Sequence, residues 1–380
     1  MNKNIVLLGV VSLLTDISSE MIYPLIPIYL TAVLGASPAA LGFIEGVAES
    51  LASLLKVFSG RLADRARRRK PLTITGYALS VMGKALFIAA TSWTGILWAR
   101  LCDRLGKGVR TAPRDALIVD SIGTDERGKA FGLHRAMDTA GAVIGIGTAY
   151  WLFTQYSGSY LLVFWLSVIP AVLGVVLLFF VHESQKTIHT PIKQVKFFWR
   201  ALDPQLKFFL LVSFFFNLGN SSNQFLLVRA GSQGFSPSEV ILLYFLMNIV
   251  YLGAALPSGI LSDKIGRKWL LVLGYCVYGL VYIGFANLNG RMEIISLFGV
   301  YGLYIGFTEG VEKALLADIA SEFQRATVFG LHALIVGIAL LPASLLAGAL
   351  WSAFGAAAPF WFGGVTGLGA AATLMIGLRK

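Results

Sequence analysis

Twelve apolar stretches, each long enough to cross a lipid bilayer, divide this chain from one end to the other. A spanning helix needs about 20 mostly apolar residues, so twelve helices use roughly 240 residues and leave room only for short connections. Hydrophobic residues make up 56% of the chain and charged residues 13%, a balance that no soluble core can bury. We therefore predict an all-α membrane protein with twelve transmembrane helices. The predicted spans are 5–33, 39–60, 72–92, 94–120, 129–153, 159–181, 206–230, 238–260, 269–288, 293–318, 326–350 and 355–377.

Basic residues gather in every second connection between these stretches. The runs 61–70, 193–207 and 264–268 are rich in lysine and arginine, whereas 35–38 and 156–160 carry no charge. Because lysine and arginine mark the cytoplasmic loops of membrane proteins, both termini are predicted to be cytoplasmic. The same rule explains the net charge of +11 without a nucleic-acid partner.

Several classes of protein are disfavoured by what the chain lacks. The first stretch is too long for a secretory signal peptide, and Asp16 and Glu20 interrupt it, so we expect a retained first helix. Cys102 and Cys276 lie inside apolar runs and are expected to pack there without a disulfide. No GxxxxGK[ST] loop is present, which argues against ATP-driven pumping. We expect no enzymatic activity, cofactor or metal site.

The second half of the chain repeats the first. Phe131-Gly-Leu-His134 recurs as Phe329-Gly-Leu-His332, and 332 − 134 = 198 residues; Asp120 and Asp318 share this offset. A repeat of this length in the same order predicts two parallel six-helix halves. The predicted parts are an N-terminal bundle at 1–181, a cytoplasmic linker at 182–205 that is partly an amphipathic helix, and a C-terminal bundle at 206–380.

A basic turn belongs to this repeat. Ser59-Gly-Arg-Leu-Ala-Asp-Arg-Ala-Arg-Arg-Arg-Lys-Pro71 recurs as Ser258-Gly-Ile-Leu-Ser-Asp-Lys-Ile-Gly-Arg-Lys268. The first copy resembles the Gly-x-Leu-Ala-Asp-Arg-x-Gly-Arg-Arg motif of the major facilitator superfamily, with Arg67 in place of the second glycine, and 125–132 resembles its Arg-Gly-x-x-x-Gly run. Over its whole length the chain is similar to this superfamily. The resemblance implies a pseudo-symmetric 6 + 6 fold and a transport function.

The resemblance also implies a conformational latch at the two turns. In such transporters the aspartate faces the start of a helix in the other half, and a nearby arginine pairs with an acid at the end of the fourth helix. The residues assigned to the latch are Gly60, Asp64, Arg68, Asp120, Asp263, Arg267 and Asp318. The alternative is that these arginines only set the membrane topology.

Ionisable side chains occur inside the predicted spans, where they are costly unless they face a cavity or a partner. The resemblance implies that helices 1, 4, 7 and 10 line the transport pathway. The candidates for proton coupling and for the cavity are Asp16, Glu20, Glu45, Glu49, Arg104, Lys107, Arg110, Glu309, Glu312 and Lys313. The candidates for substrate binding are Tyr23, Asn217, Asn220, Asn223, Gln224 and Tyr304.

Within this set the acids are ranked as proton carriers. In order, the candidate carriers are Glu20, Asp16, Glu49 and Glu309. Arg104 is expected to pair with a carboxylate such as Glu20 or Asp103 and to tune its proton affinity. The alternative is a static ion pair between helices.

These observations predict a secondary active transporter that moves a small organic molecule across the cytoplasmic (inner) membrane by alternating access. We expect proton coupling, efflux by antiport and a monomer. The basic fourth predicted helix favours an alternative, a proton-coupled importer of a small anionic nutrient or a metal chelate. A non-transporting sensor or a lipid-handling protein is a third class, against which the intact charges in both turns argue. The sequence leaves the substrate and the coupling ion open.

Overall fold

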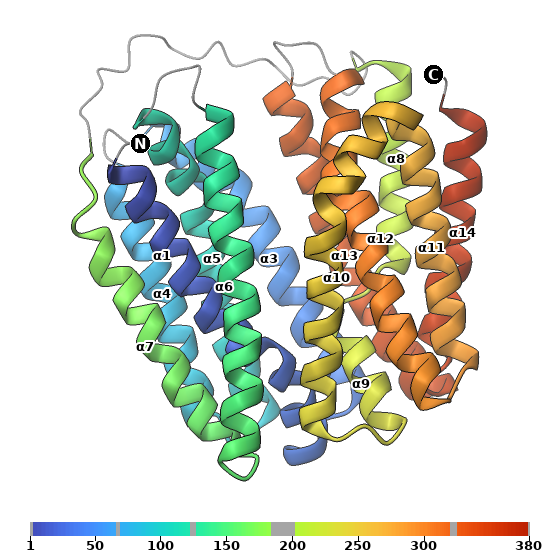
Figure 1. Ribbon diagram of the computed structural model, residues 1–380, viewed down its shortest axis with the longest axis horizontal. Coiled ribbons are helices and arrows are strands. Elements are labelled where there is room, and N and C mark those ends of the chain that lie inside the picture. Colours follow the sequence, from blue (N-terminus) through green and yellow to red (C-terminus); the bar gives the residue numbers. More distant parts are fainter. Residues whose placement is uncertain (1–2, 66–68, 122–126, 184–201, 320–324, 379–380) are drawn as a thin grey trace. The chain divides into compact units, whose positions relative to one another are not determined.

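The computed structural model describes residues 3–65, 69–121, 127–183, 202–319 and 325–378, and within them the regular structure is entirely helical (Figure 1). In the N-terminal half, α1 (Lys3–Ile22) continues through three short helical turns to Val33. The remaining helices of this half are α3 (Pro38–Arg65), α4 (Lys70–Ala89), α5 (Trp93–Asp120), α6 (Arg127–Gln155) and α7 (Tyr160–Leu178).

The C-terminal half begins with a span in two pieces, α8 (Pro204–Gly219) and α9 (Gln224–Ser232). Five continuous helices follow. They are α10 (Pro237–Ile265), α11 (Arg267–Asn287), α12 (Arg291–Ile319), α13 (Arg325–Phe354) and α14 (Ala358–Gly377). Eleven of the twelve predicted spans therefore correspond to continuous helical segments, whereas the span predicted at 206–230 is interrupted. The predicted amphipathic linker helix lies outside the described residues, apart from its two ends.

Nine helical segments in the described part of the chain are long and apolar enough to cross a membrane. Helix α5 is not among them because its charges lower its hydropathy. Its charged side chains are Arg100, Asp103, Arg104, Lys107, Arg110, Arg114, Asp115 and Asp120. A helix this charged between apolar neighbours has to turn its ionic side towards protein or water.

The chain forms two compact units, and the same helix pairs pack together in each. The first unit comprises Met1–Ala36 and Val47–Lys193, and the second comprises Ser37–Gly46 and Gln194–Lys380. In the first, α1 packs on α6 and α7, and α4 packs on α5 and α7. In the second, α8 packs on α13 and α14, and α11 packs on α12 and α14. These are equivalent pairs under the 198-residue repeat, so the duplication seen in the sequence is also a duplication of packing.

Paired glycines make the closest of these crossings possible. A Cβ atom on Gly76 of α4 would lie 2.7 Å from the backbone nitrogen of Arg110, and one on Gly274 of α11 would lie 2.6 Å from Cγ2 of Thr308. Both offsets are 198 residues (274 − 76 and 308 − 110). Small residues let membrane helices approach closely and pack by van der Waals contact. The repeated Gly-Tyr pair therefore preserves one helix crossing in each unit.

Glycines also allow helix α6 to pack closely on α1. A Cβ atom on Gly141 would lie 2.5 Å from the carbonyl oxygen of Leu13, and one on Gly145 would lie 2.5 Å from that of Ile17. The four-residue spacing places both glycines on one side of α6. This contact fixes α1, which carries Asp16 and Glu20, against the rest of the first unit.

Candidate functional site

A stripe of cations runs along α5 in the first unit. The stripe consists of Arg100, Arg104, Lys107, Arg110 and Arg114. Their spacing of three or four residues places them on one side of the helix. Three helices supply the groups that meet the first part of this stripe, namely α1, α3 and α4.

Two carboxylates, those of Glu49 and Asp103, form ion pairs with three buried cations. Glu49 on α3 lies 3.6 Å from Nη2 of Arg100 and 3.4 Å from Nε of Arg104. Asp103 lies 3.7 Å from Nζ of Lys84 and 3.6 Å from Nε of Arg104. The side chains of the cations and of Asp103 are at most 8% exposed, so the pairs offset the cost of removing these charges from water. The expected pairing of Arg104 with Asp103 is confirmed as a contact; its effect on proton affinity stays a prediction.

The ion-pair network around Arg100 also contacts Tyr23, a predicted substrate-binding residue on the first span. The guanidinium of Arg100 lies over the ring of Tyr23, 5.4 Å from its centroid. Lys84 also donates a hydrogen bond from Nζ to Oγ of Ser19 at 3.2 Å. Cation–π and hydrogen-bond contacts of this kind fix α1 against α4 and α5. We therefore assign Tyr23 and Glu49 a positioning role around Arg100.

Two groups on this side of the unit are held by no direct partner. Among the described residues, no hydrogen bond or ion pair engages the carboxylate of Asp16 or the ammonium of Lys107. Arg110 is different, because it is only 5% exposed, donates a hydrogen bond to Oγ of Ser80 and lies 4.5 Å over the ring of Tyr77. Glu20 lies one helical turn from Asp16. Asp16 and Lys107 are thus the groups left available for a ligand or a proton.

The second unit brings its polar groups together at the gap between α8 and α9. Tyr278 donates a hydrogen bond to the carbonyl of Gly219 at 2.8 Å, where α8 ends. Asn220 donates one to Oη of Tyr304 at 3.2 Å, and Tyr301 donates one to Oδ1 of Asn223 at 2.7 Å. Backbone groups freed inside a membrane must find partners in the protein, and tyrosine hydroxyls help to supply them here. Broken spans of this kind form binding sites in secondary transporters.

Three further candidate residues, Asn217, Glu45 and Gln224, lie around the gap between α8 and α9 and differ in their hydrogen bonding. Asn217 donates a hydrogen bond to the carbonyl of Ser213 at 2.8 Å, so its amide is tied to its own helix. Glu45, which is fully buried, accepts a hydrogen bond from Oγ of Ser222 at 3.2 Å, and both residues belong to the second unit. Gln224 is fully buried, and neither amide atom has a hydrogen-bond partner in the described part of the chain. Gln224 is therefore the amide that remains free to bind.

A second group of acids lies on α12. Tyr251 donates a hydrogen bond to Oε2 of Glu309 at 2.5 Å, and Tyr275 donates one to Oε1 of Glu312 at 2.9 Å. Nε2 of His332 lies 3.8 Å from Oε2 of Glu312 and 3.0 Å from Oγ of Ser213. The side chain of Lys313 is exposed. His332 was not among the predicted site residues, although its place in the Phe-Gly-Leu-His repeat was the signal that could have identified it.

The second copy of the basic turn, which carries three of the predicted latch residues, forms contacts within its own unit. Arg267 lies 3.6 Å from Oδ1 of Asp263, pairs with Asp318 and donates a hydrogen bond to the carbonyl of Ala314 at 2.5 Å. These contacts tie the start of α11 to the end of α12. In the first copy, Gly60 is part of α3, while Arg68 and the side chains of Asp64 and Asp120 lie outside the described residues.

The contacts also identify which arginine of the first copy is equivalent to Arg267. Arg69 donates a hydrogen bond from Nη1 to the carbonyl of Ala116 at 3.4 Å, and both residues precede Arg267 and Ala314 by 198. The next residue repeats as well. Lys70 donates a hydrogen bond to the carbonyl of Phe179 at 2.8 Å, beyond the end of α7, and Lys268 donates one to that of Leu378, beyond the end of α14. Each Arg-Lys pair thus binds two helix ends, where free carbonyls attract cations.

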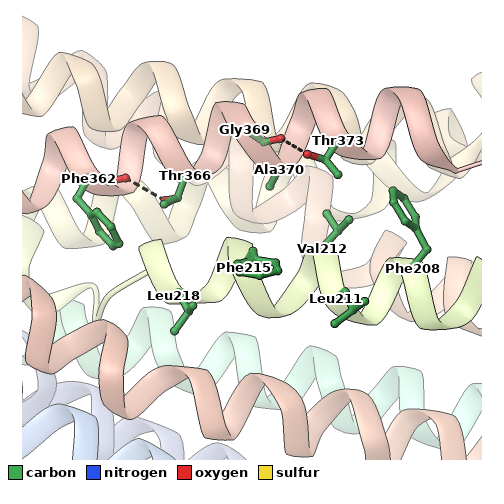
Figure 2. Close-up of a pocket in the computed structure, with 10 residues that line it drawn as sticks. All are labelled: Phe208, Leu211, Val212, Phe215, Leu218, Phe362, Thr366, Gly369, Ala370 and Thr373. Atoms are coloured by element: carbon green, nitrogen blue, oxygen red, sulfur yellow. Dashed lines mark hydrogen bonds between the residues drawn. The ribbon is translucent and has the colours of Figure 1, made fainter. Parts of the chain in front are cut away.

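An apolar groove lies between α8 and α14 (Figure 2). Its volume is about 560 Å³, and it is lined by Phe208, Leu211, Val212, Phe215, Leu218, Phe362, Thr366, Gly369, Ala370 and Thr373. Its two hydroxyl groups are already satisfied, because Thr366 and Thr373 donate to the carbonyls of Phe362 and Gly369 on their own helix (Figure 2). The groove therefore offers hydrocarbon contact and no free polar group, unlike the two polar clusters.

Comparisons with known proteins agree with this architecture. The family model of the major facilitator superfamily matches residues 8–229 and 209–380. The chain is 40% identical over 362 residues to the MFS-type transporter MJ1317 of Methanocaldococcus jannaschii, covering 92% of this chain and 89% of that protein. It is 28% identical over 342 residues to the multidrug resistance protein MdtH of Photorhabdus laumondii, covering 87% and 81%. Among solved structures, the nucleoside transporter NupG has a TM-score of 0.79 at 13% identity, with 100% of both chains covered, which shows a common fold.

Proposed function

This chain belongs to the major facilitator superfamily and is a multi-pass membrane transporter, and from that premise we propose that it exports a small organic molecule in exchange for protons. In the proposed cycle the two units expose a shared pathway to one side of the cytoplasmic membrane and then to the other. The basic connections support cytoplasmic termini. The name of the MdtH relative, a multidrug resistance protein, supports export.

The observation that carries the coupling proposal is the carboxylate of Asp16. It lies in a spanning helix and is held by no ion pair or hydrogen bond among the described residues. Glu49, in contrast, lies close to two arginines that keep it charged. A carboxyl group without a fixed cation can lose and regain a proton during transport, whereas a paired one is held ionised. We assign the proton to the pair Asp16 and Glu20, which share one side of α1.

The test is proton movement in proteoliposomes. Purified protein is reconstituted with a pH-sensitive dye inside the vesicles, and candidate drugs and nucleosides are added under an imposed proton gradient. We expect an active compound to move protons in the native protein. Glu20→Gln should lose proton movement while still binding the compound, and Asp16→Asn should lose proton movement. Glu293→Gln, near the start of α12, should behave as the native protein.

The result separates the coupling acids from other roles. Transport that continues without proton movement in the native protein would contradict proton coupling. Loss of compound binding in Glu20→Gln would make Glu20 a substrate ligand instead of a proton carrier.

A second candidate function is the import of an anionic nutrient or a metal chelate. The observation that favours it is Lys107, an exposed ammonium in the middle of α5 with buried arginines on either side of it in the stripe. Uptake that is driven by an inward proton gradient, measured with the same vesicles, distinguishes this candidate from exchange.

A further inference from the structure

In the first unit, the charged side chains around Lys107 form a basic region and those around Asp16 form an acidic region. Lys107 lies within electrostatic range of Arg104 and Arg110 on its own helix, and of Glu49 and Asp16 on the facing helices. Glu49 already pairs with two arginines, so it does not neutralise Lys107. The region around Lys107 therefore keeps an excess of positive charge.

The acidic region lies on α1 and α6. Asp16 is within electrostatic range of Glu20 and Asp138, as well as of Lys107 and Arg110 on α5. His134, one turn from Asp138 on α6, lies 3.5 Å from that carboxylate, and Arg114, Asp115 and Arg135 are within electrostatic range of His134. Lys84 on α4 is within electrostatic range of Asp16. Asp16 itself has no hydrogen bond or ion pair in the described part of the chain. One side of this surface thus presents a free carboxylate and the other a free ammonium.

The depth at which Lys107 lies in the membrane indicates what its side chain needs as a partner. Lys107 is the fifteenth of the 28 residues of α5, so it is at the middle of its span. An unpaired charge at that depth is costly against lipid, and the side chain of Lys107 is exposed, so its ammonium needs water or a ligand as a partner. Asp16 and Lys107 attract each other but form no ion pair, so both charges remain for a ligand to neutralise.

We propose that Asp16 and Lys107 bind the opposite charges of a zwitterionic substrate, its ammonium group at Asp16 and its carboxylate or similar anion at Lys107. The inference rests on the proposed function and adds its substrate class. It also gives the exchange a physical basis, because a proton and the ammonium group compete for the same carboxylate. A substrate with only one charge would leave one of the two protein charges unpaired.

The test uses matched sets of probes that differ only in charge. One set is phenylalanine, phenethylamine and 3-phenylpropionate; the other is leucine, isoamylamine and 4-methylpentanoate. The melting temperature of the purified full-length protein is measured in detergent as each probe is titrated, since a ligand that binds the folded protein stabilises it by RT ln(1 + [L]/Kd) and so raises this temperature. We expect at least one zwitterion to raise it at concentrations about tenfold lower than either singly charged partner does.

The two variants should change charge preference in opposite directions. Lys107→Gln should remove the advantage of the zwitterion over the amine, and Asp16→Asn should remove its advantage over the acid. Lys264→Gln and Glu293→Gln, at exposed positions of the second unit, are the matched controls and should keep the native preference. Each variant is expected to retain binding to one class of probe. This opposite pattern distinguishes loss of one charge contact from loss of folding, which would abolish the binding of every probe.

Other outcomes overturn the inference. It is wrong if no zwitterion exceeds its singly charged partners, or if both variants keep the native preference. Because this assay uses no gradient, it is independent of the proton-movement assay. Proton exchange with a substrate that is not zwitterionic would leave the proposed function intact and remove this inference.

Discussion

At the scale of single residues, the buried ions of the first unit divide into structural and available groups. Asp103 contacts Lys84, Arg100 and Arg104, while Asp115 pairs with its neighbour Arg114 at 2.8 Å. The side chain of Asp103 is 8% exposed and that of Asp115 is 42% exposed. Asp103 and Asp115 therefore differ in burial and in the number of cations that they contact.

Replacing these two aspartates tests that division. Asp103→Asn leaves buried cations without a counter-charge and should lower the free energy of unfolding by about 3–5 kcal/mol. Asp115→Asn weakens a partly exposed pair and should cost less than about 1 kcal/mol. The melting temperatures of both variants in detergent measure the difference, and equal losses would contradict the structural role of Asp103.

The sequence predicted which charged residues share one side of a helix, because this depends only on their spacing along that helix. The charges of α5 and the paired acids of α1 follow from helical periodicity. The partner of Arg104 required knowledge of which helices touch, and spacing did not distinguish Glu20 from Asp103 or identify Glu49. The same limit explains Arg69: the turn contains three consecutive arginines, and only the contact with Ala116 distinguishes Arg69 from Arg68.

At the scale of helices, glycines decide which pairs approach. Gly141 lies against the backbone of α1, whereas Gly299 on α12 has no atom within 4 Å of an added Cβ. Both residues are inside long helices. A methyl group at the two positions therefore meets a neighbouring backbone in one case and open space in the other.

Gly141→Ala and Gly299→Ala should change stability with opposite signs. The first forces α6 away from α1 and should cost about 1–3 kcal/mol. The second improves helix propensity at an open site and should add up to about 1 kcal/mol. Thermal unfolding of the two variants in detergent measures both effects, and a stabilised Gly141→Ala would contradict the close packing of α6 on α1.

The interrupted span shows where sequence prediction of an element failed. Residues 206–230 read as one apolar run, because Asn220, Ser221, Ser222 and Asn223 are uncharged and occupy only one turn. Tyrosines on α11 and α12 bond the carbonyl of Gly219 and the side chains of Asn220 and Asn223, which provides polar partners at the break. Those partners are 59 to 84 residues away in the sequence, so no local pattern indicates the break.

At the scale of the whole molecule, the duplication was predictable, although the sequence indicated Arg68 and not Arg69 as the equivalent of Arg267. The 198-residue offset pairs Arg69 with Arg267, Ala116 with Ala314 and Gly76 with Gly274, and each pair makes an equivalent contact in its own unit. Substrate identity was not predictable, because the duplicated residues are those that hold helices together. The polar groups available for binding differ between the halves, ionic in the first and amide or phenolic in the second.

The predicted topology is tested by accessibility of single cysteines. In a background with Cys102 and Cys276 replaced by alanine, Ser157→Cys between α6 and α7 should react with an impermeant thiol reagent from outside intact cells. Lys264→Cys, at the end of α10, should react only after the membrane is opened. Labelling of both from the outside would contradict cytoplasmic termini.

The gap between α8 and α9 also has a mechanical meaning. A continuous helix resists bending because each turn is hydrogen-bonded to the next, but this ladder is interrupted at the residues from Gly219 to Asn223. Their bonds run sideways to Tyr278, Tyr304 and Tyr301 on neighbouring helices. The direction of α9 is therefore set by its contacts with neighbouring helices, including the hydrogen bond from Arg229 to the carbonyl of Phe285, and not by a backbone ladder continuous with α8.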